Sequence, residues 1–257
     1  MNVKAKKHLG QHFLTDENIA KKIVEGLDFQ PYQYVLEVGP GTGVLTKYLL
    51  EKPTETYVAE IDTESIEYLK LHFQKLENKH FTGDFLKINL NDIFSGEVAI
   101  IGNFPYNISS QILFKIIENY QQIPEMVGMF QKEVAERTAA VPRTKDYGIL
   151  SVLVQAYYDV KYLFTVHENV FNPPPKVKSG VIKLTRNRKE GLEGNEVLFK
   201  QIVKTGFGQR RKKLSNALKS LDIPEVLKSH AFMDKRAEEL SVEDFINFTQ
   251  EWKAAKN

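Results

Sequence analysis

An amide, a proline and an aromatic ring follow one of the most apolar runs of the chain. Asn103, Pro105 and Tyr106 come directly after residues 98–102 (VAIIG), which predict a buried strand. An Asn side-chain oxygen and a backbone carbonyl beside proline can each accept one N–H from the exocyclic amine of an aromatic base, on which a tyrosine ring can stack. The two acceptors would localise the amine's lone pair and make its nitrogen more nucleophilic. Residues 103–106, the lip, therefore predict chemistry on an aromatic amine, although they also suit a strand-ending turn.

A glycine-rich loop follows a second apolar run. Residues 34–38 (YVLEV) predict a strand, residues 39–43 (GPGTG) follow it, and residues 44–49 continue with the spacing of a helix. A strand, a glycine loop and a helix form the first unit of a doubly wound sheet, which binds ligands beyond the carboxyl ends of its strands. Because glycine lets the backbone approach a ligand closely, we expect Gly39 and Gly41 to contact a cofactor.

The next predicted strand, residues 56–61, ends in an acidic residue. Glu60 and Ile61 stand about 20 positions after the glycine loop, where a carboxylate can hold the hydroxyls of a ribose. The loop reads Gly-x-Gly-x-Gly, unlike dinucleotide-binding loops, and there is no Gly-Lys-Ser/Thr phosphate loop. S-adenosylmethionine, which combines a ribose with an amino acid, fits this pattern better. The alternative is a tight turn and a surface carboxylate.

Asp84 and Phe85 extend the predicted cofactor site. They follow a short predicted strand at residues 79–82, so they should reach the same edge of the sheet. Asp84 can accept the amino group of an adenine, and Phe85 can lie against its ring. Gly-Asp is also a common turn, which is the ordinary alternative.

The composition excludes several classes of protein. The 257 residues are 42% hydrophobic and 26% charged, as in a globular protein with a proper core, and the net charge is only +2. The absence of cysteine excludes disulfides, thiolate metal sites and a cysteine nucleophile, and the histidines show no metal-ligand spacing. A base deaminase, which needs a zinc-activated water, is therefore disfavoured. We expect a cytoplasmic monomer without a bound metal or a membrane span.

Two domains are predicted. Strands and helices alternate over residues 1–186, which predicts an α/β, doubly wound, mostly parallel sheet of the S-adenosylmethionine-dependent methyltransferase type. The last two strands, at residues 160–166 and 177–184, should form an antiparallel pair at one edge. Between them, three prolines predict a stiff surface loop that presents Phe171. From residue 187 the pattern is purely helical, so we expect a small all-α domain at residues 187–257.

Basic residues gather in two places. Lys4, Lys6 and Lys7 lie in the N-terminal arm. Arg210, Arg211, Lys212 and Lys213 follow Phe207 in the helical domain. Both groups can bind the phosphates of a nucleic acid without reading its bases. The alternatives are a solvated tail and a solvated helix start.

Seven short motifs occur in order along nearly the whole chain. They are residues 10–14 (GQHFL), 37–43 (EVGPGTG), 60–62 (EID), 83–84 (GD), 103–109 (NFPYNIS), 131–134 (QKEV) and 171–177 (FNPPPKV). Together they resemble the ribosomal RNA adenine dimethyltransferase family, in particular its bacterial small-subunit branch, whose loss gives kasugamycin resistance. Within that resemblance, His12 stands where the family usually has Asn, and Phe104 where Leu is common.

The resemblance implies transfer of four methyl groups from S-adenosylmethionine to N6 of two adjacent adenosines near the 3′ end of 16S rRNA, with S-adenosylhomocysteine as product. It implies a partner, the small ribosomal subunit, and a role in its biogenesis. The implied cofactor contacts fall on His12, Leu14, Gly39, Glu60, Asp84 and Asn103. The target base would stack between Tyr106 and Phe171. A large-subunit rRNA methyltransferase and a catalytically silent ribosome-assembly factor are the alternatives.

Overall fold

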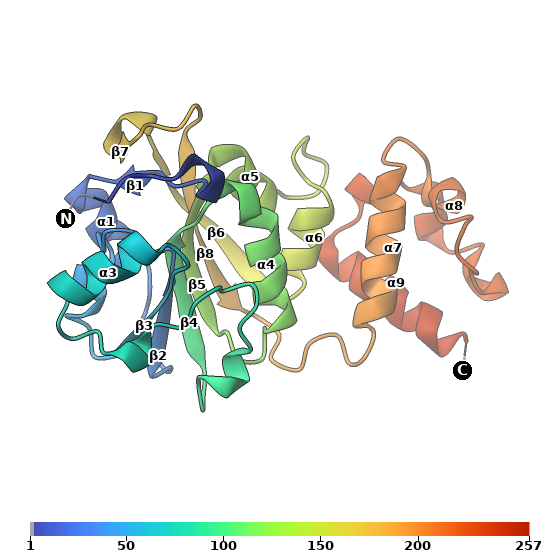
Figure 1. Cartoon of the computed structure of the whole chain (residues 1–257). Coiled ribbons are helices and arrows are strands. Elements are labelled where there is room, and N and C mark those ends of the chain that lie inside the picture. The colour runs from blue at the N-terminus through green and yellow to red at the C-terminus, as the bar shows by residue number, and fades with distance from the viewer. Residues whose placement is uncertain (1–2, 257) are drawn as a thin grey trace. The chain divides into compact units, whose positions relative to one another are not determined.

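Six strands form one sheet, in the order β3-β2-β4-β5-β8-β6, in the computed structural model, which describes residues 3–256 (Figure 1). They are β2 (Tyr34–Val38), β3 (Glu55–Ala59), β4 (Val98–Asn103), β5 (Glu125–Gln131), β6 (Tyr158–Val166) and β8 (Ser179–Arg186). The strands β3, β2, β4 and β5 are parallel, and β8 runs antiparallel to β5. The prediction of a mostly parallel sheet with the late strands at one edge is confirmed.

Helices follow the strands as the apolar spacing predicts. They are α1 (Glu17–Val24), α2 (Thr46–Leu49), α3 (Thr63–His72), α4 (Ser109–Glu118) and α5 (Lys132–Thr138). α1 begins after Asp16, whose carboxylate accepts hydrogen bonds from the backbone nitrogens of Asn18 and Ile19. Its apolar face, including Ile23, packs in one core with alternate strand residues such as Ile101. This core holds the strand ends, and therefore the site, in place.

A second, two-stranded sheet joins distant parts of the chain. β1 (Phe13–Leu14) pairs antiparallel with β7 (Phe171–Asn172), and neither strand was predicted. This ladder attaches the N-terminal segment to the start of the proline loop.

The strand predicted at residues 79–82 is largely absent. Asn78–His80 form a 3-10 helix, and only Phe81 bridges to Val58 of β3. The ring nitrogen Nδ1 of His80 accepts a hydrogen bond from the backbone nitrogen of Glu77, 2.9 Å away. This local turn takes the place of the expected ladder.

The chain divides into two compact units. The sheet unit contains Met1–Ala135 and Val160–Arg186, and the helical unit contains Glu136–Asp159 and Asn187–Asn257. The sequence places the break after residue 186, and the units also divide there. The segment at residues 136–159, however, belongs to the helical unit although the sequence places it in the sheet domain.

The helical unit has a core of its own. Its helices are α6 (Ile149–Gln155), α7 (Glu196–Gly208), α8 (Leu214–Ala217) and α9 (Val242–Ala254). Tyr147 is fully buried there and donates a hydrogen bond to the carbonyl of Leu240, at 2.9 Å. Its ring also packs on Phe207, which in turn packs on Phe245. These contacts explain why residues 136–159 belong to this unit. No helix within residues 3–256 is long and apolar enough to span a membrane.

Candidate active site

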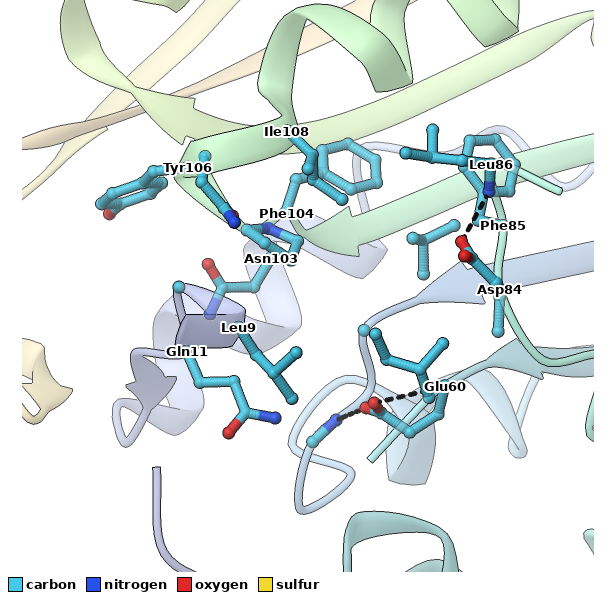
Figure 2. A pocket seen from close by; sticks show the side chains of 18 of the residues that line it. Leu9, Gln11, Glu60, Asp84, Phe85, Leu86, Asn103, Phe104, Tyr106 and Ile108 are labelled. Carbon is cyan, nitrogen blue, oxygen red and sulfur yellow. Dashed lines mark hydrogen bonds between the residues drawn. The ribbon is translucent and has the colours of Figure 1, made fainter. Parts of the chain in front are cut away.

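A pocket opens at the carboxyl ends of β2, β3 and β4 in the sheet unit (Figure 2). Parallel strands bring these ends to one edge, so segments far apart in sequence meet there. Most of the predicted site residues line it: His12, Gly39, Gly41, Glu60, Ile61, Asp84, Phe85, Asn103, Pro105 and Tyr106. The pocket therefore contains both the predicted cofactor residues and the lip.

Glu60 is fixed at the end of β3 by backbone donors. Its carboxylate accepts hydrogen bonds from the backbone nitrogens of Ile61 and Asp62, at 2.8 and 2.9 Å, and a longer one from Gly41, at 3.3 Å. Burial raises the pKa of Glu60 even though these donors oppose the shift. Two carboxylate oxygens offer about four lone pairs, so one remains for a ligand hydroxyl.

The glycine loop requires glycine at Gly41. Its φ of +56° is left-handed, and a Cβ there would lie 2.8 Å from the ring of Phe13. The loop thus lies close against the N-terminal segment, and its backbone N–H faces the carboxylate of Glu60.

An apolar and acidic wall continues the pocket beyond Glu60. Ile61 is 56% exposed although it lines the pocket, and Phe85 adds a ring to the same wall. Asp84 accepts a hydrogen bond from the backbone nitrogen of Leu86, at 3.0 Å, as Figure 2 shows. Exposed apolar surface suits a flat adenine, and the Asp84 and Glu60 oxygens suit an amine and ribose hydroxyls. The residues present therefore fit a cofactor that carries adenosine.

The lip presents two hydrogen-bond acceptors. The Nδ2 atom of Asn103 donates to the carbonyl of His12, at 2.8 Å. Because that nitrogen is engaged, Oδ1 is the side-chain atom left to accept from a substrate amine. The carbonyl of Pro105 accepts one hydrogen bond from the backbone nitrogen of Ile108, at 3.3 Å, and keeps its second lone pair.

The ring of Tyr106 lies against the imidazole of His12. Their centroids are 5.5 Å apart and their planes differ by 27°. The Tyr106 hydroxyl is hydrogen-bonded to Oγ of Ser179, and Nδ1 of His12 lies 2.8 Å from the carbonyl of Pro173. A carbonyl only accepts, so Nδ1 carries a proton. Burial raises the pKa of Tyr106, so its hydroxyl stays protonated at neutral pH.

Phe171 and Leu14 do not line this pocket. Phe171 is 4% exposed and packs in the core beside Leu14, its partner in the β1–β7 ladder. The expectation that the proline loop presents Phe171 at the surface is wrong, because Phe171 enters this ladder before the prolines begin. Leu14 lines a small cavity behind the glycine loop. The ring that stacks on Tyr106 belongs to His12.

The N-terminal segment, residues 6–13, forms one wall of the pocket. Leu9, Gln11 and Phe13 line it, and sequence reasoning missed them although the motif at residues 10–14 pointed to this segment. Lys6 forms ion pairs with Asp62 and, at 3.2 Å, with Glu64. Lys6, a predicted RNA contact, is thus engaged inside the protein, whereas Lys4 and Lys7 are exposed.

Of the four cations at residues 210–213 of the helical unit, two are paired with carboxylates of residues 3–256 and two are not. Arg210 pairs with Glu238 and donates to the carbonyls of Lys145 and Thr144, at 2.8 and 3.1 Å. Lys213 pairs with Asp234 at 2.9 Å. Arg211 and Lys212 are exposed. Arg210 and Lys213 therefore each have a carboxylate partner within the unit, and the Lys213–Asp234 pair is exposed to solvent.

Comparison with models of protein families shows the family of this chain. The model of the ribosomal RNA adenine dimethylase family matches residues 2–254. The chain belongs to this family. The resemblance that the seven motifs carry is thereby confirmed.

Individual adenine dimethylase relatives agree. A ribosomal RNA small subunit methyltransferase A of Flavobacterium johnsoniae is 59% identical over 253 residues, which cover 98% of this chain and 97% of the relative. Another, of Cytophaga hutchinsonii, is 57% identical over 249 residues, 96% of each chain. Among solved structures, a dimethyladenosine transferase from Plasmodium falciparum has a TM-score of 0.83 at 26% identity, covering 95% of this chain and 98% of its own. The 23S rRNA methyltransferase ErmE has a TM-score of 0.69 at 25% identity, covering 94% and 99%.

Proposed function

We propose that this adenine dimethylase transfers methyl groups from S-adenosylmethionine to N6 of two adjacent adenosines near the 3′ end of 16S rRNA. The supporting observation is that the two acceptors of the lip line the same pocket as Glu60 and Asp84. The small subunit is the proposed substrate because relatives with 59% and 57% identity bear that name. The enzyme acts as a monomer in the cytoplasm, during small-subunit biogenesis.

The cofactor residues have separate tasks. Glu60 accepts hydrogen bonds from the ribose, Asp84 from the adenine amine, and Ile61 and Phe85 cover the adenine faces. Gly39 and Gly41 let the backbone approach the amino acid part. When bound, S-adenosylmethionine supplies an electrophilic methyl group on a sulfonium.

The lip activates the substrate amine by position. The target adenosine leaves its stack, and its base lies against the Tyr106 and His12 rings. Stacking contributes about 1–3 kcal/mol per base, comparable with the few kcal/mol that extrusion costs. Asn103 Oδ1 and the Pro105 carbonyl then accept the two amine hydrogens, which localises the lone pair on nitrogen. The methylated amine is acidic enough to lose its proton to water.

The second transfer places a further demand on the lip. After the first transfer one N–H remains, so only one of the two acceptors can be used. The amine has to rotate and carry a methyl group within the same space. The fixed orientation of Asn103, held by its bond to His12, keeps one acceptor in place for both steps.

Exposed cations are the proposed phosphate ligands. They are Lys4 and Lys7 in the sheet unit and Arg211 and Lys212 in the helical unit. Lys6, Arg210 and Lys213 are left out of this set because each is paired with a carboxylate of its own unit.

Methyl transfer to purified ribosomal subunits tests the proposal. Unmethylated small subunits are incubated with the protein and labelled cofactor, and modified nucleotides are mapped by mass spectrometry. We expect four methyl groups on two adjacent adenosines of 16S rRNA. Label on large subunits would identify the large-subunit activity instead. Binding of small subunits without release of S-adenosylhomocysteine would identify a silent assembly factor.

Asn103→Ala tests the role of the lip. Loss of one well-placed electrostatic contact lowers a chemical rate by about 10²–10³-fold, and we expect a loss of that size in single-turnover transfer. Cofactor affinity, measured by calorimetry, should change little because Glu60 and Asp84 remain. Asn91→Ala, at an exposed position of the same unit, is the control. Equal rates for the two variants would show that the Asn103 amide has no part in the reaction.

A further inference from the structure

Two glycines face each other beneath the lip. Gly102 of β4 and Gly128 of β5 are register partners in the parallel ladder. A Cβ at Gly128 would lie 2.1 Å from Cε2 of Phe104, and a Cβ at Gly102 would lie 2.8 Å from its Cε1. The ring of Phe104, 1% exposed, therefore fills a slot that exists because both positions lack side chains.

Phe104 is also part of the lip. It stands between Asn103 and Pro105, which carry the two acceptors, and its backbone nitrogen donates to the carbonyl of Met129, at 3.1 Å. Its ring packs on Phe130, with centroids 4.9 Å apart, and it lines the pocket. Because the ring is buried and enclosed on several sides, it has little room to change rotamer, so overpacking against it shifts the backbone that carries the flanking acceptors.

We propose that Phe104 is a positioning residue for methyl transfer. Its ring fills the slot formed by Gly102 and Gly128, and the depth to which it enters that slot sets the positions of the two acceptors of the lip. Bulk at residue 104 and bulk at residue 128 then exclude each other. A displacement of about 1 Å in a reacting group can lower a rate 10²-fold, so a ring pushed out of the slot slows transfer without touching the cofactor residues. The inference rests on the proposed function only in that methyl transfer is its readout.

The two glycines differ in what else a side chain would meet. At Gly128 the remaining close atom is Sδ of Met126, at 2.9 Å, the end of a flexible side chain. At Gly102 it is the backbone carbonyl oxygen of Val38, at 2.5 Å, which cannot move aside. Leucine at 104 removes the Cε2 contact at 2.1 Å, and the space that the ring leaves lets its Cδ atoms move away from the 2.8 Å contact that Cδ2 of Phe104 would make. It therefore relieves Gly128→Ala but not Gly102→Ala.

The test is a set of second-site variants of the full chain. Gly128→Ala, Phe104→Leu, Gly102→Ala and the two double variants with Phe104→Leu are compared with wild type. Gly96→Ala is the matched control, because a Cβ there would meet nothing within 4 Å. Single-turnover transfer, cofactor affinity by calorimetry, and the ratio of dimethylated to monomethylated adenosine are measured.

We expect Gly128→Ala to slow transfer by about 10–10²-fold, with cofactor affinity unchanged and monomethyl product enriched. Phe104→Leu in the same chain should restore transfer at least to the rate of Phe104→Leu alone. Gly102→Ala should show no such rescue. A loss of fold stability alone could also be rescued by Phe104→Leu, but it would not change the product ratio, so enrichment of the monomethyl product is the readout that separates positioning from stability.

Each outcome either supports or overturns the inference. A wild-type protein without transfer would overturn the proposed function, and this inference with it. Transfer by wild type together with equal rates for Gly128→Ala and Gly96→Ala would overturn this inference alone. If Gly128→Ala does not fold, the double variant decides: a folded double with restored transfer supports the slot. A double variant that transfers more slowly than Phe104→Leu alone, or that also fails to fold, refutes the inference.

Discussion

At the scale of single residues, a buried carboxyl group stands behind the glycine loop. Glu37 is 1% exposed, and the hydroxyl of Thr46 donates to it at 2.5 Å. Burial raises the pKa of Glu37 to about 8, and the nearby charge of Glu60 adds to the shift. Glu37 is therefore mostly neutral at neutral pH, so it adds little negative charge behind the glycine loop.

This shift makes the stability of the cofactor-free protein depend on pH. The folded-state pKa lies above the ordinary value of 4.5, so the stabilisation is complete below pH 4.5 and is lost as pH rises through about 8. Between these values the free energy of unfolding should fall by up to about 1.4 kcal/mol per pH unit from this group. Glu37→Gln, which mimics the neutral form, should remove that slope in denaturant titrations from pH 5 to 9. Glu67→Gln, at an exposed position, is the control, and parallel curves for wild type and Glu37→Gln would refute the assignment.

At the scale of elements, an ion-pair cluster helps to hold the N-terminal segment over the pocket, together with the β1–β7 ladder and the hydrogen bond from Asn103 to His12. Lys6 reaches Asp62 and Glu64 at the start of α3, and its backbone nitrogen donates to Oε1 of Gln11, at 2.8 Å. Gln11 lines the pocket, so the Lys6 contacts fix a wall of the cofactor site.

Loss of either partner should loosen that wall to the same extent. We expect Lys6→Ala and Asp62→Asn each to weaken cofactor affinity by about tenfold, and the double variant to be no weaker than the worse single one, because both remove one interaction. Calorimetry gives the three affinities. Lys7→Ala removes an exposed neighbouring charge and should bind as wild type does. Additive losses, or an effect of Lys7→Ala equal to that of Lys6→Ala, would contradict this account.

The elements that could be predicted are those whose signals are local. β2 and β4 were found because each is an apolar run that ends at a glycine or a polar residue, and α1 because Asp16 caps it. The prediction of a strand at residues 79–82 was wrong because a local turn takes the place of the ladder. β1 and β7 were missed because two-residue strands have no period of their own, and the burial of Phe171 follows from that pairing.

The features of the site are likewise predictable only in part. Its cofactor residues and lip could be predicted because parallel strands bring their ends together whatever the details of packing. The stacking of His12 on Tyr106 and the opposition of Gly102 and Gly128 depend on partners far apart in sequence. A sequence shows neither register nor rotamer, so these contacts could not be foreseen.

At the scale of the whole molecule, phosphate binding depends on which lysines and arginines are exposed and unpaired more than on the net charge. The net charge of +2 would attract a polyanion only weakly. Several lysines and arginines are also paired with carboxylates of the protein itself. Arg210 holds Glu238 and two backbone carbonyls of the segment at residues 136–159, all within the helical unit. Its neighbours Arg211 and Lys212 extend the same run into solvent.

Adjacent cations should therefore respond differently to substitution. Each phosphate contact contributes about 0.7–0.9 to the slope of log affinity against log salt, so Arg211→Ala with Lys212→Ala should reduce that slope for small subunits by about 1.4–1.8. Arg210→Ala should leave the slope unchanged and lower the melting temperature, because it leaves Glu238 unpaired and two carbonyls without their donor. Lys219→Ala with Lys228→Ala removes the same net charge elsewhere in the unit and serves as control. An equal change of slope in that control would mean that the helical unit attracts rRNA by its total charge, and that Arg211 and Lys212 make no contacts of their own.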